Sequence, residues 1–415
     1  MKGHTDGAAL FDKAVALYES GGDRLECAQM FEKSAQMLEN EGAPQRQSAM
    51  AYNRAGMCHF KCGSGTDIES QAFEKARSLM KELPDHNSDP LMAIIRSNLA
   101  ECCARSGDLL ESAKLYRQAS VTFSNLMYSE LAAGTPGQAF NQYICVEKSL
   151  AELYRDMEEY IQAQTCLTRI IELAEKHCDY SPATDEMLCS FYNARGTIRF
   201  RMGDYEGEIA DCTEAIVRCE QLGSDPMGLA IMYSNRGEAY EMLGRYDDMI
   251  VNMRQALDSL EKCESGEEAD TMSFRISYSL ARGLEKSGRL TEAAKVYGQA
   301  ADIISRMASG EDVSMHLRAE AACRINRAAC LSHCELHLYY DSMKEYNRAA
   351  KLLEGLENDN NALARLRTLY LSRSELFEAF DELEAAKADY IRAENIAKLI
   401  GQKDAEPPTE APEQA

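Results

Sequence analysis

One spacing of residue types recurs along almost the whole chain. In its clearest copy, Tyr233 is followed four residues later by Gly237, then by Tyr240, Gly244 and Ala256. A self-similar unit of this length is typical of stacked helical arrays, in which each unit buries its apolar side against its neighbours. The repeat therefore predicts the fold class more firmly than any single residue does.

Further copies can be followed from Phe11 to Ala393. Each ends on a residue that is small in every copy but the fourth, and these terminal positions are Ser34, Ala76, Ala119, Ile170, Ala215, Ala256, Ala300, Ala349 and Ala393. They recur at intervals of 42, 43, 51, 45, 41, 44, 49 and 44 residues. A bulky residue usually stands three positions earlier, from Phe31 in the first copy to Tyr390 in the ninth. The fourth and eighth copies match the spacing least well.

The spacing fits a helix, a tight turn and a second helix. The first three residues of the pattern in each copy fall at i, i+4 and i+7, which places them on one face of an α-helix. The following glycine, Gly22 in the first copy, supplies a left-handed C-cap where that helix must stop. Glu158 and Asp381 occupy this glycine position in the fourth and ninth copies. We therefore predict an all-α solenoid of about nine helix-turn-helix repeats.

The pattern resembles the tetratricopeptide repeat (TPR) over roughly residues 8–400. The signature of that family is an aromatic, a Leu-Gly pair, a Tyr, then Ala, an aromatic and Ala, and the fifth to seventh copies match it best. The period exceeds the usual ~34 residues, so both helices should be longer. Similar long-period arrays occur in kinesin light chains, cell-polarity and membrane-fusion adaptors, bacterial peptide-pheromone receptors and bacterial sensor domains. The resemblance implies a right-handed superhelix with a concave groove that binds peptides or proteins.

Charge and composition narrow the classes of partner. The formal net charge is -23, from 68 acidic and 45 basic side chains. Such a surface repels phosphate backbones, so nucleic acid is not expected as a partner, and a basic peptide or protein face is favoured. The same acidity also serves simply to keep a long chain soluble. No apolar run approaches the ~20 residues of a membrane-spanning helix.

The cysteines indicate a compartment. All 15 are scattered through predicted helices, and MKGHTDGAALF at the start lacks the apolar core of a signal peptide. A chain this rich in cysteine without an export signal is most simply a reduced, cytoplasmic protein. Oligomeric state and partner identity cannot be inferred from these features.

The longest interval contains LAAGTPGQAF at 131–140, a Gly/Pro-dense stretch. We interpret it as a loop insertion and hinge between N-terminal repeats 1–3 (1–130) and repeats 4–9 (141–401). Residues 402–415 are acidic and Pro-rich and are expected to be disordered.

No enzyme motif stands out. CGSGTD at 62–67 lacks the strand and the Lys-Ser/Thr of a phosphate-binding loop and fits the turn of the second copy. Near 323–337, Cys330, His333, Cys334 and His337 share one helix face. Four ligands along a straight helix span about 10 Å, so a metal site would need a neighbouring helix. We therefore predict no enzyme activity, cofactor or metal, and keep a Cys/His metal-binding protein as a third alternative.

Asparagine recurs just inside the predicted first helix of several copies. Asn53, Asn98, Asn193, Asn235 and Asn326 hold this place, and in the TPR family it faces the groove. Asparagine both donates and accepts, so a ladder of these amides could pair with the backbone of an extended peptide. The alternative is that each amide bonds locally to a neighbouring helix.

The same projection places a second row of side chains one turn further along. Met57, Glu101, Thr197, Glu238 and Arg282 form this row. Together with the first row, the predicted groove residues are Asn53, Met57, Asn98, Glu101, Asn193, Thr197, Asn235, Glu238 and Arg282. The leading hypothesis is a non-enzymatic protein- or peptide-binding scaffold. The alternative is a peptide- or ligand-sensing regulator that changes superhelix pitch on binding.

Overall fold

The computed structural model describes residues 6–405, except 135–136, 180, 224, 308–312, 335–337 and 357–358. Across this part of the chain there are eighteen α-helices, one short 3-10 helix and no strand. None of the helices described is both long enough and apolar enough to cross a membrane.

The chain divides into two compact units, Met1–Asp204 and Tyr205–Ala415. The helices of the first unit are α1 (Asp6–Glu19), α2 (Arg24–Asn40), α3 (Gln45–Cys62), α4 (Thr66–Lys81), η1 (His86–Ser88), α5 (Pro90–Arg105), α6 (Leu109–Ala132), α7 (Gln138–Asp156), α8 (Tyr160–His177) and α9 (Pro182–Arg201). Those of the second are α10 (Tyr205–Leu222), α11 (Pro226–Met242), α12 (Tyr246–Leu260), α13 (Glu267–Lys286), α14 (Leu290–Met307), α15 (Val313–Cys334), α16 (Tyr339–Glu354), α17 (Asn360–Ala379) and α18 (Leu383–Ala405).

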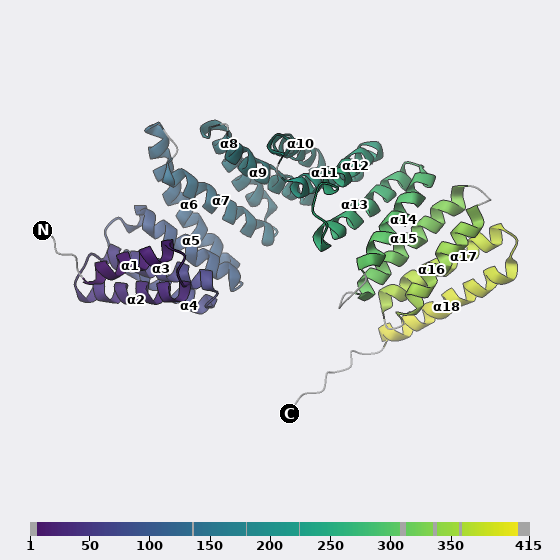
Figure 1. Ribbon diagram of the computed structural model, residues 1–415, viewed down its shortest axis with the longest axis horizontal. Coiled ribbons are helices and arrows are strands. Elements are labelled where there is room, and N and C mark those ends of the chain that lie inside the picture. Colours follow the sequence, from purple (N-terminus) through teal and green to yellow (C-terminus); the bar gives the residue numbers. More distant parts are fainter. Residues whose placement is uncertain are drawn as a thin grey trace, which may run out of the picture. The chain divides into compact units, whose positions relative to one another are not determined.

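Each predicted copy is one pair of helices, so the helix-pair repeat is confirmed. Consecutive helices pack against each other within each unit, as the successive colours of Figure 1 show. The first helices of neighbouring pairs also touch, α3 with α5 and α5 with α7 in the first unit, and α11 with α13 and α15 with α17 in the second. First helices therefore line one continuous face within these stretches.

The repeat register is confirmed at the terminal position of every copy. All nine residues from Ser34 to Ala393 are fully buried, each with 0% exposure. The bulky residues three positions earlier are buried in the first eight copies, with exposures of 4% or less. The exception is Tyr390 on α18, which is 54% exposed. No helix pair follows α18 in the described part of the chain, so nothing there covers this side chain.

In two of the pairs, a glycine of the first helix makes room for that bulky side chain. A Cβ added at Gly56 would stand 2.6 Å from Cε1 of Phe73, which is 2% exposed. At Gly237 it would stand 2.8 Å from Cε of Met253. Helix axes can approach closely because one surface is empty where the other projects, as expected from packing side chains into grooves.

Left-handed residues end the first helices at the predicted turn positions. Gly63, Gly107, Gly203, Gly244 and Gly288 all have φ between 67° and 87°. Glu158 and Asp381 take the same conformation, with φ of 61° and 63°. The first copy is a correction, because Gly21 at φ 80° is the left-handed residue. Gly22 instead donates its N–H to the Leu17 carbonyl at 2.9 Å and leaves no space for a Cβ beside that leucine.

Glu158→Gly is expected to stabilise the protein by about 1 kcal/mol. A non-glycine residue in the left-handed region carries steric strain of roughly 1–2 kcal/mol, and glycine removes it at a smaller cost in unfolded-chain entropy. The N–H groups of Glu158 and Glu159, which close the turn at 3.0 and 2.8 Å, remain. Thermal and urea melts would measure the change. Asp156→Gly, at the last residue of α7, is the control and should destabilise the protein. Equal effects of the two substitutions would contradict the claim that Glu158 is strained.

Arginine forms a recurrent polar bridge, which we call the arginine staple. The arginine stands one residue before the small residue of the first helix, as Arg195, Arg236 and Arg373. Arg236 bonds Thr213 on the preceding pair at 3.0 Å and Asn252 on its own second helix at 2.8 Å. Arg195 bonds Thr168 of the preceding pair at 3.2 Å. Each staple thus fixes a first helix against the pair before it.

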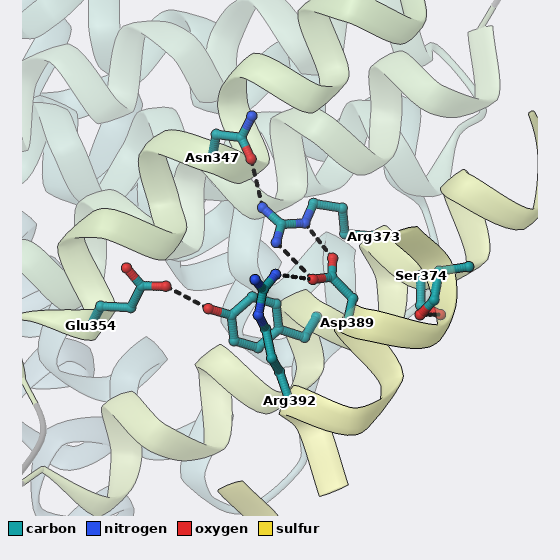
Figure 2. Close-up of polar contacts among 8 residues, drawn as sticks. Asn347, Glu354, Arg373, Ser374, Asp389 and Arg392 are labelled. Carbon is teal, nitrogen blue, oxygen red and sulfur yellow. Dashed lines mark hydrogen bonds and ion pairs between the residues drawn. The ribbon is translucent and has the colours of Figure 1, made fainter. Parts of the chain in front are cut away.

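The staple of Arg373 is the strongest electrostatically (Figure 2). Arg373 donates a hydrogen bond to Asn347 on α16. It also donates to both carboxylate oxygens of Asp389 on α18, with Nη2 to Oδ1 at 2.9 Å. Arg392 also bonds Asp389, at 2.7 Å. Asp389 is 1% exposed. A buried carboxylate survives only when paired and hydrogen-bonded, so three helices are held by one charge cluster.

A second recurrent bond lies beside the staple. The leading tyrosine of the first helix donates its hydroxyl to a glutamate on the preceding second helix, as Tyr192 to Glu175, Tyr233 to Glu220 and Tyr370 to Glu354. Burial first, then the neighbouring glutamate, raises the pKa of Tyr233 and of Tyr370 to about 12. The hydroxyl therefore stays protonated and remains a donor at neutral pH.

Half of the predicted insertion at 131–140 lies in helices. α6 runs to Ala132 and α7 begins at Gln138, while residues 135–136 lie outside the described residues. Glu130, near the end of α6, accepts the backbone N–H groups of Ala139 and Phe140 at 3.1 Å each. Its carboxylate thereby satisfies donors at the open start of α7. The hinge stays a prediction, as does the block boundary placed there.

The end of the array extends beyond its predicted limit. α18 continues to Ala405, so it includes the first four residues of the expected tail at 402–415. Residues 406–415 lie outside the part of the chain that the structure describes.

Candidate functional site

The predicted groove residues all lie on first helices. Asn53 and Met57 are on α3, Asn98 and Glu101 on α5, Asn193 and Thr197 on α9, Asn235 and Glu238 on α11, and Arg282 on α13. Since α3, α5 and α7 contact one another in order, the residues on α3 and α5 share one surface of the first unit.

The first two asparagines bond to each other. Asn98 donates from Nδ2 to Oδ1 of Asn53 at 2.9 Å, so a rung joins α3 to α5. Asn53 is 4% exposed, and its own amide points to Sδ of Met57 at 3.9 Å, a weak acceptor. Asn53 therefore orients Asn98, whose half-buried amide keeps a carbonyl and one N–H for a ligand. Bonding between helices was the alternative considered from the sequence for these amides.

The second row is also partly engaged. Glu101 accepts the Tyr116 hydroxyl at 2.9 Å. Burial and then Glu101 raise the pKa of Tyr116 well above its usual range. Thr197 is exposed and donates to the backbone carbonyl of Asn193 at 3.0 Å, one turn earlier. The second carboxylate oxygen of Glu101 and the lone pairs of the Thr197 hydroxyl can still accept hydrogen bonds from a ligand.

A hollow of about 250 Å³ lies beside the α9 members of the predicted set, and we call it the polar hollow for its charged and amide side chains, although Leu167, Phe191 and Ile198 also line it. Asn193 and Thr197 line it from α9. Across from them, α7 contributes Lys148, Glu152 and Arg155. It thus carries both signs of charge, and a peptide segment with polar or charged side chains would be complementary to it.

A larger, mainly apolar hollow of about 590 Å³ is lined by residues of α3, α5, α6 and the start of α7. Met50 of α3 and Ile94 of α5 line it and stand one turn before Asn53 and Asn98. Its other lining residues are Arg46, Pro90, Leu91, Phe123, Leu126, Ser129, Glu130, Ala133, Gln138, Ala139 and Gln142. Apolar side chains one turn ahead of the asparagines were the signal in the sequence that could have revealed Met50 and Ile94.

The unusual length of α6 forms one wall of this apolar hollow. α6 has 24 residues, and its last turns carry Phe123, Leu126 and Ser129 to the hollow. At the rim, Arg46 pairs with Asp89 at 2.8 Å. This pair and the N–H of Leu91 oppose the effect of burial and hold the pKa of Asp89 below its usual range. The two charges at the rim therefore neutralise each other, while the interior of the hollow suits an apolar side chain.

The second unit places its predicted residues in an acidic setting. Arg282 is ion-paired to Glu241. Burial raises the pKa of Glu238, and the positive charges of Arg275 and Arg282 oppose that rise. Burial, with Glu238 and Asp211 nearby, also raises the pKa of Glu208 to about 8. Glu208 is therefore largely protonated near neutral pH, and a cationic group brought beside these carboxyls would favour their ionised forms.

The structure brings together no metal-binding group among the residues it describes. Within this set, no three His, Cys, Asp or Glu side chains are arranged to hold an ion. Cys330 is 2% exposed, while the side chain of Cys334 and all of His337 lie outside the described residues. In the second pair, His59 lies 3.2 Å from Glu32 and 3.1 Å from Ser64, and burial raises the pKa of Cys58 to about 11.

Comparison with known proteins bears on the fold. No family model matches the sequence, and no curated protein matches it either. Among solved structures, the apo form of RapI is similar with a TM-score of 0.55 and 12% identity, covering 95% of this chain and 98% of RapI. The C-terminal part of a TPR repeat-containing protein from Cytophaga hutchinsonii gives 0.52 and 11%, covering 74% of this chain and 99% of that one.

The fold is that of a TPR-like helical solenoid. The resemblance deduced from the repeat is thereby confirmed at the level of architecture. At 11–12% identity the likeness carries no information about ligands. For this TPR-like chain, function must therefore be argued from the first-helix surface itself.

Proposed function

We propose that this chain is a non-enzymatic scaffold that binds a protein or an extended peptide along the first helices, in the groove predicted from the sequence. The observation that carries the proposal is that two hollows open beside the same helix. α7 lines the apolar hollow through Gln138, Ala139 and Gln142, and the polar hollow through Lys148, Glu152 and Arg155. A ligand lying along α7 would place an apolar side chain in one and a polar or charged side chain in the other.

Further features support the same proposal. Asn98, held by Asn53, offers a directed amide between the helices, which suits the backbone of an extended peptide. The polar groups are already oriented before a ligand arrives, which lowers the entropy cost of binding. The net charge of -23 favours a basic partner. We place the protein in the cytoplasm and expect no nucleic-acid partner and no insertion into a membrane.

Selection from a displayed library of linear peptides tests this proposal. The dissociation constants of the selected peptides would be measured for the wild type, Ile94→Glu and Asn193→Ala. We expect losses of tenfold or more, since central contacts of this kind are typically worth more than 1 kcal/mol. Leu110→Glu is the control, because Leu110 is 74% exposed on α6 and lines neither hollow. Unchanged affinity in both groove variants, with unaltered melting, would overturn the proposal.

The regulatory alternative predicts a different physical response. A sensor that changes pitch must alter its radius of gyration when the selected peptide binds, whereas a preformed scaffold keeps it. Small-angle X-ray scattering of the free and saturated protein separates the two. A change of radius with retained groove dependence would assign the chain to the sensing class.

A further inference from the structure

The third helix pair departs from the tyrosine–glutamate bond described above. Arg96 stands four residues before Ala100, the place held by Tyr192, Tyr233 and Tyr370 in their pairs. The glutamates that accept hydrogen bonds from those hydroxyls stand five residues after the terminal position of the preceding copy. In the copy preceding Arg96, the corresponding residue after Ala76 is Lys81. Both partners of the recurrent bond are thus replaced by basic residues.

Arg96 is buried without a carboxylate partner. It is 9% exposed, and within the described residues its side chain bonds to Oδ1 of Asn87 and forms no ion pair. Burial, and next the positive charge of Arg77, lower the pKa of Arg96. Buried arginines elsewhere in this chain, such as Arg324 and Arg373, have carboxylate partners. Arg77 is itself paired with Glu74 at 2.7 Å, so Arg96 is the guanidinium that lacks a carboxylate, and an approaching anion would stabilise its charge.

A pocket of about 460 Å³ opens over Arg96. Lys114, Arg117, Gln118 and Val121 line it from one face of α6, at i, i+3, i+4 and i+7. Asn87 and Thr122 complete the lining, which includes no acidic side chain among the described residues. Lys114 contacts Glu111 at 2.7 Å, whereas Arg117 makes no ion pair in the part of the chain described. Three cationic side chains therefore line one pocket in a protein of net charge -23.

The pocket wall is held in place without a ligand. The Thr122 hydroxyl donates to the backbone carbonyl of Asn87 at 2.8 Å, tying η1 to α6. Ser88 donates to the Asp85 carbonyl at 2.8 Å and closes the short turn. The Asn87 amide is consequently fixed at the mouth of the pocket, where its Nδ2 group can donate to an incoming acceptor.

We propose that this pocket, formed by η1, α5 and α6, binds a phosphate group carried by a ligand. Two guanidinium groups, one ammonium and two amides supply more donors and more positive charge than a single carboxylate can use. A phosphate monoester brings about -1.5 to -2 charges and three acceptor oxygens, and arginine recognises it with paired hydrogen bonds. The volume leaves room for the group that bears the phosphate. The site is separate from the first-helix hollows and does not depend on the scaffold proposal.

Two sources of the phosphate share this chemistry, and the test distinguishes them. Calorimetric titration of the full chain would use inorganic phosphate, phenyl phosphate, a phosphotyrosine peptide, and the same peptide with unmodified tyrosine or with glutamate. Selective binding of the phosphopeptide would indicate a phosphorylated partner. Binding of the small phosphates alone would indicate a free phosphate compound. Either result supports the site, provided that the pocket variants abolish it.

The variants are Arg117→Gln and Arg96→Gln, with Arg201→Gln as the control at an exposed arginine of α9. We expect a loss of about tenfold for Arg117→Gln and a larger loss for Arg96→Gln. Arg117 is exposed, so its variant keeps the test valid even where Arg96→Gln perturbs folding. The proposal is overturned if no phosphate probe binds, if the peptides bind but the glutamate peptide does so as tightly as the phosphopeptide, or if Arg117→Gln behaves as Arg201→Gln does.

Discussion

Asp389→Ala is expected to destabilise the last helix pair by about 3–5 kcal/mol, because it leaves the Arg373 guanidinium buried without its counter-charge. Arg373 has 8% of its side chain exposed and makes two bonds to Asp389. Asn347 would remain as a neutral acceptor, which cannot offset the desolvation of a full charge. The effect should concentrate in α16, α17 and α18, which meet at this cluster (Figure 2).

Amide hydrogen exchange measures that effect where it arises. A long repeat array does not unfold as one two-state unit, so a single melting temperature would dilute the change. Protection in α17 and α18 should fall by about 100-fold or more, at 1.4 kcal/mol per tenfold. Arg392→Ala is the control, because Arg392 is 57% exposed and its loss should cost about 1 kcal/mol or less.

A double replacement separates charge from packing. Arg373→Met with Asp389→Leu removes both charges together, and such exchanges of a buried pair are often neutral or stabilising. We expect protection in the double variant to return most of the way to the wild type. A double variant as unstable as Asp389→Ala would show that shape, rather than the ion pair, holds these helices.

Gly56→Leu is expected to destabilise the second helix pair by about 3 kcal/mol, because the new side chain must occupy the space filled by the Phe73 ring. Even the first added carbon would lie 2.6 Å from that ring. Phe73→Ala should cost about 3–5 kcal/mol by leaving a cavity. Combined, the two changes should cost less than their sum, since one fills what the other empties.

Urea denaturation of the four proteins in this cycle gives the coupling energy. Gly237→Ala is the control for adding a side chain at the equivalent position, because the one atom closer than 3.0 Å to its Cβ would be the flexible end of Met253. There the helix preference for alanine of up to ~1 kcal/mol should offset most of the crowding. Additive costs for Gly56→Leu and Phe73→Ala would mean that the two residues do not share one space.

The fold could be predicted because its determinants repeat at fixed spacing. Ser34, Ala119 and Ile170 are equally buried although their chemistry differs, so position in the repeat mattered more than residue type. Glu158 and Asp381 take the left-handed conformation without being glycine, because the two flanking helices impose the turn. Local spacing did not distinguish Gly21 from Gly22, where adjacent glycines offer two ways to end the helix.

The candidate site was less accessible to sequence reasoning. The asparagine positions could be placed on first helices, but the bond between Asn53 and Asn98 depends on the distance between α3 and α5. The apolar hollow depends on the extra turns of α6, which the sequence suggested only as an insertion near residue 131. The arginine staple was missed although Arg195, Arg236 and Arg373 share one place in the repeat.

The staples bear on how an array of this kind can change in length. Thr213 and Asn347, which accept from the next pair's arginine, occupy the same place two residues before the terminal alanine. Asn252 and Asp389, which accept within the arginine's own pair, likewise share a place four residues before that alanine. Helix pairs that carry these residues therefore form equivalent hydrogen bonds with their neighbours. Duplication or loss of one whole pair would reconnect donor to acceptor at the new junction, whereas an insertion of a few residues within a helix would separate them.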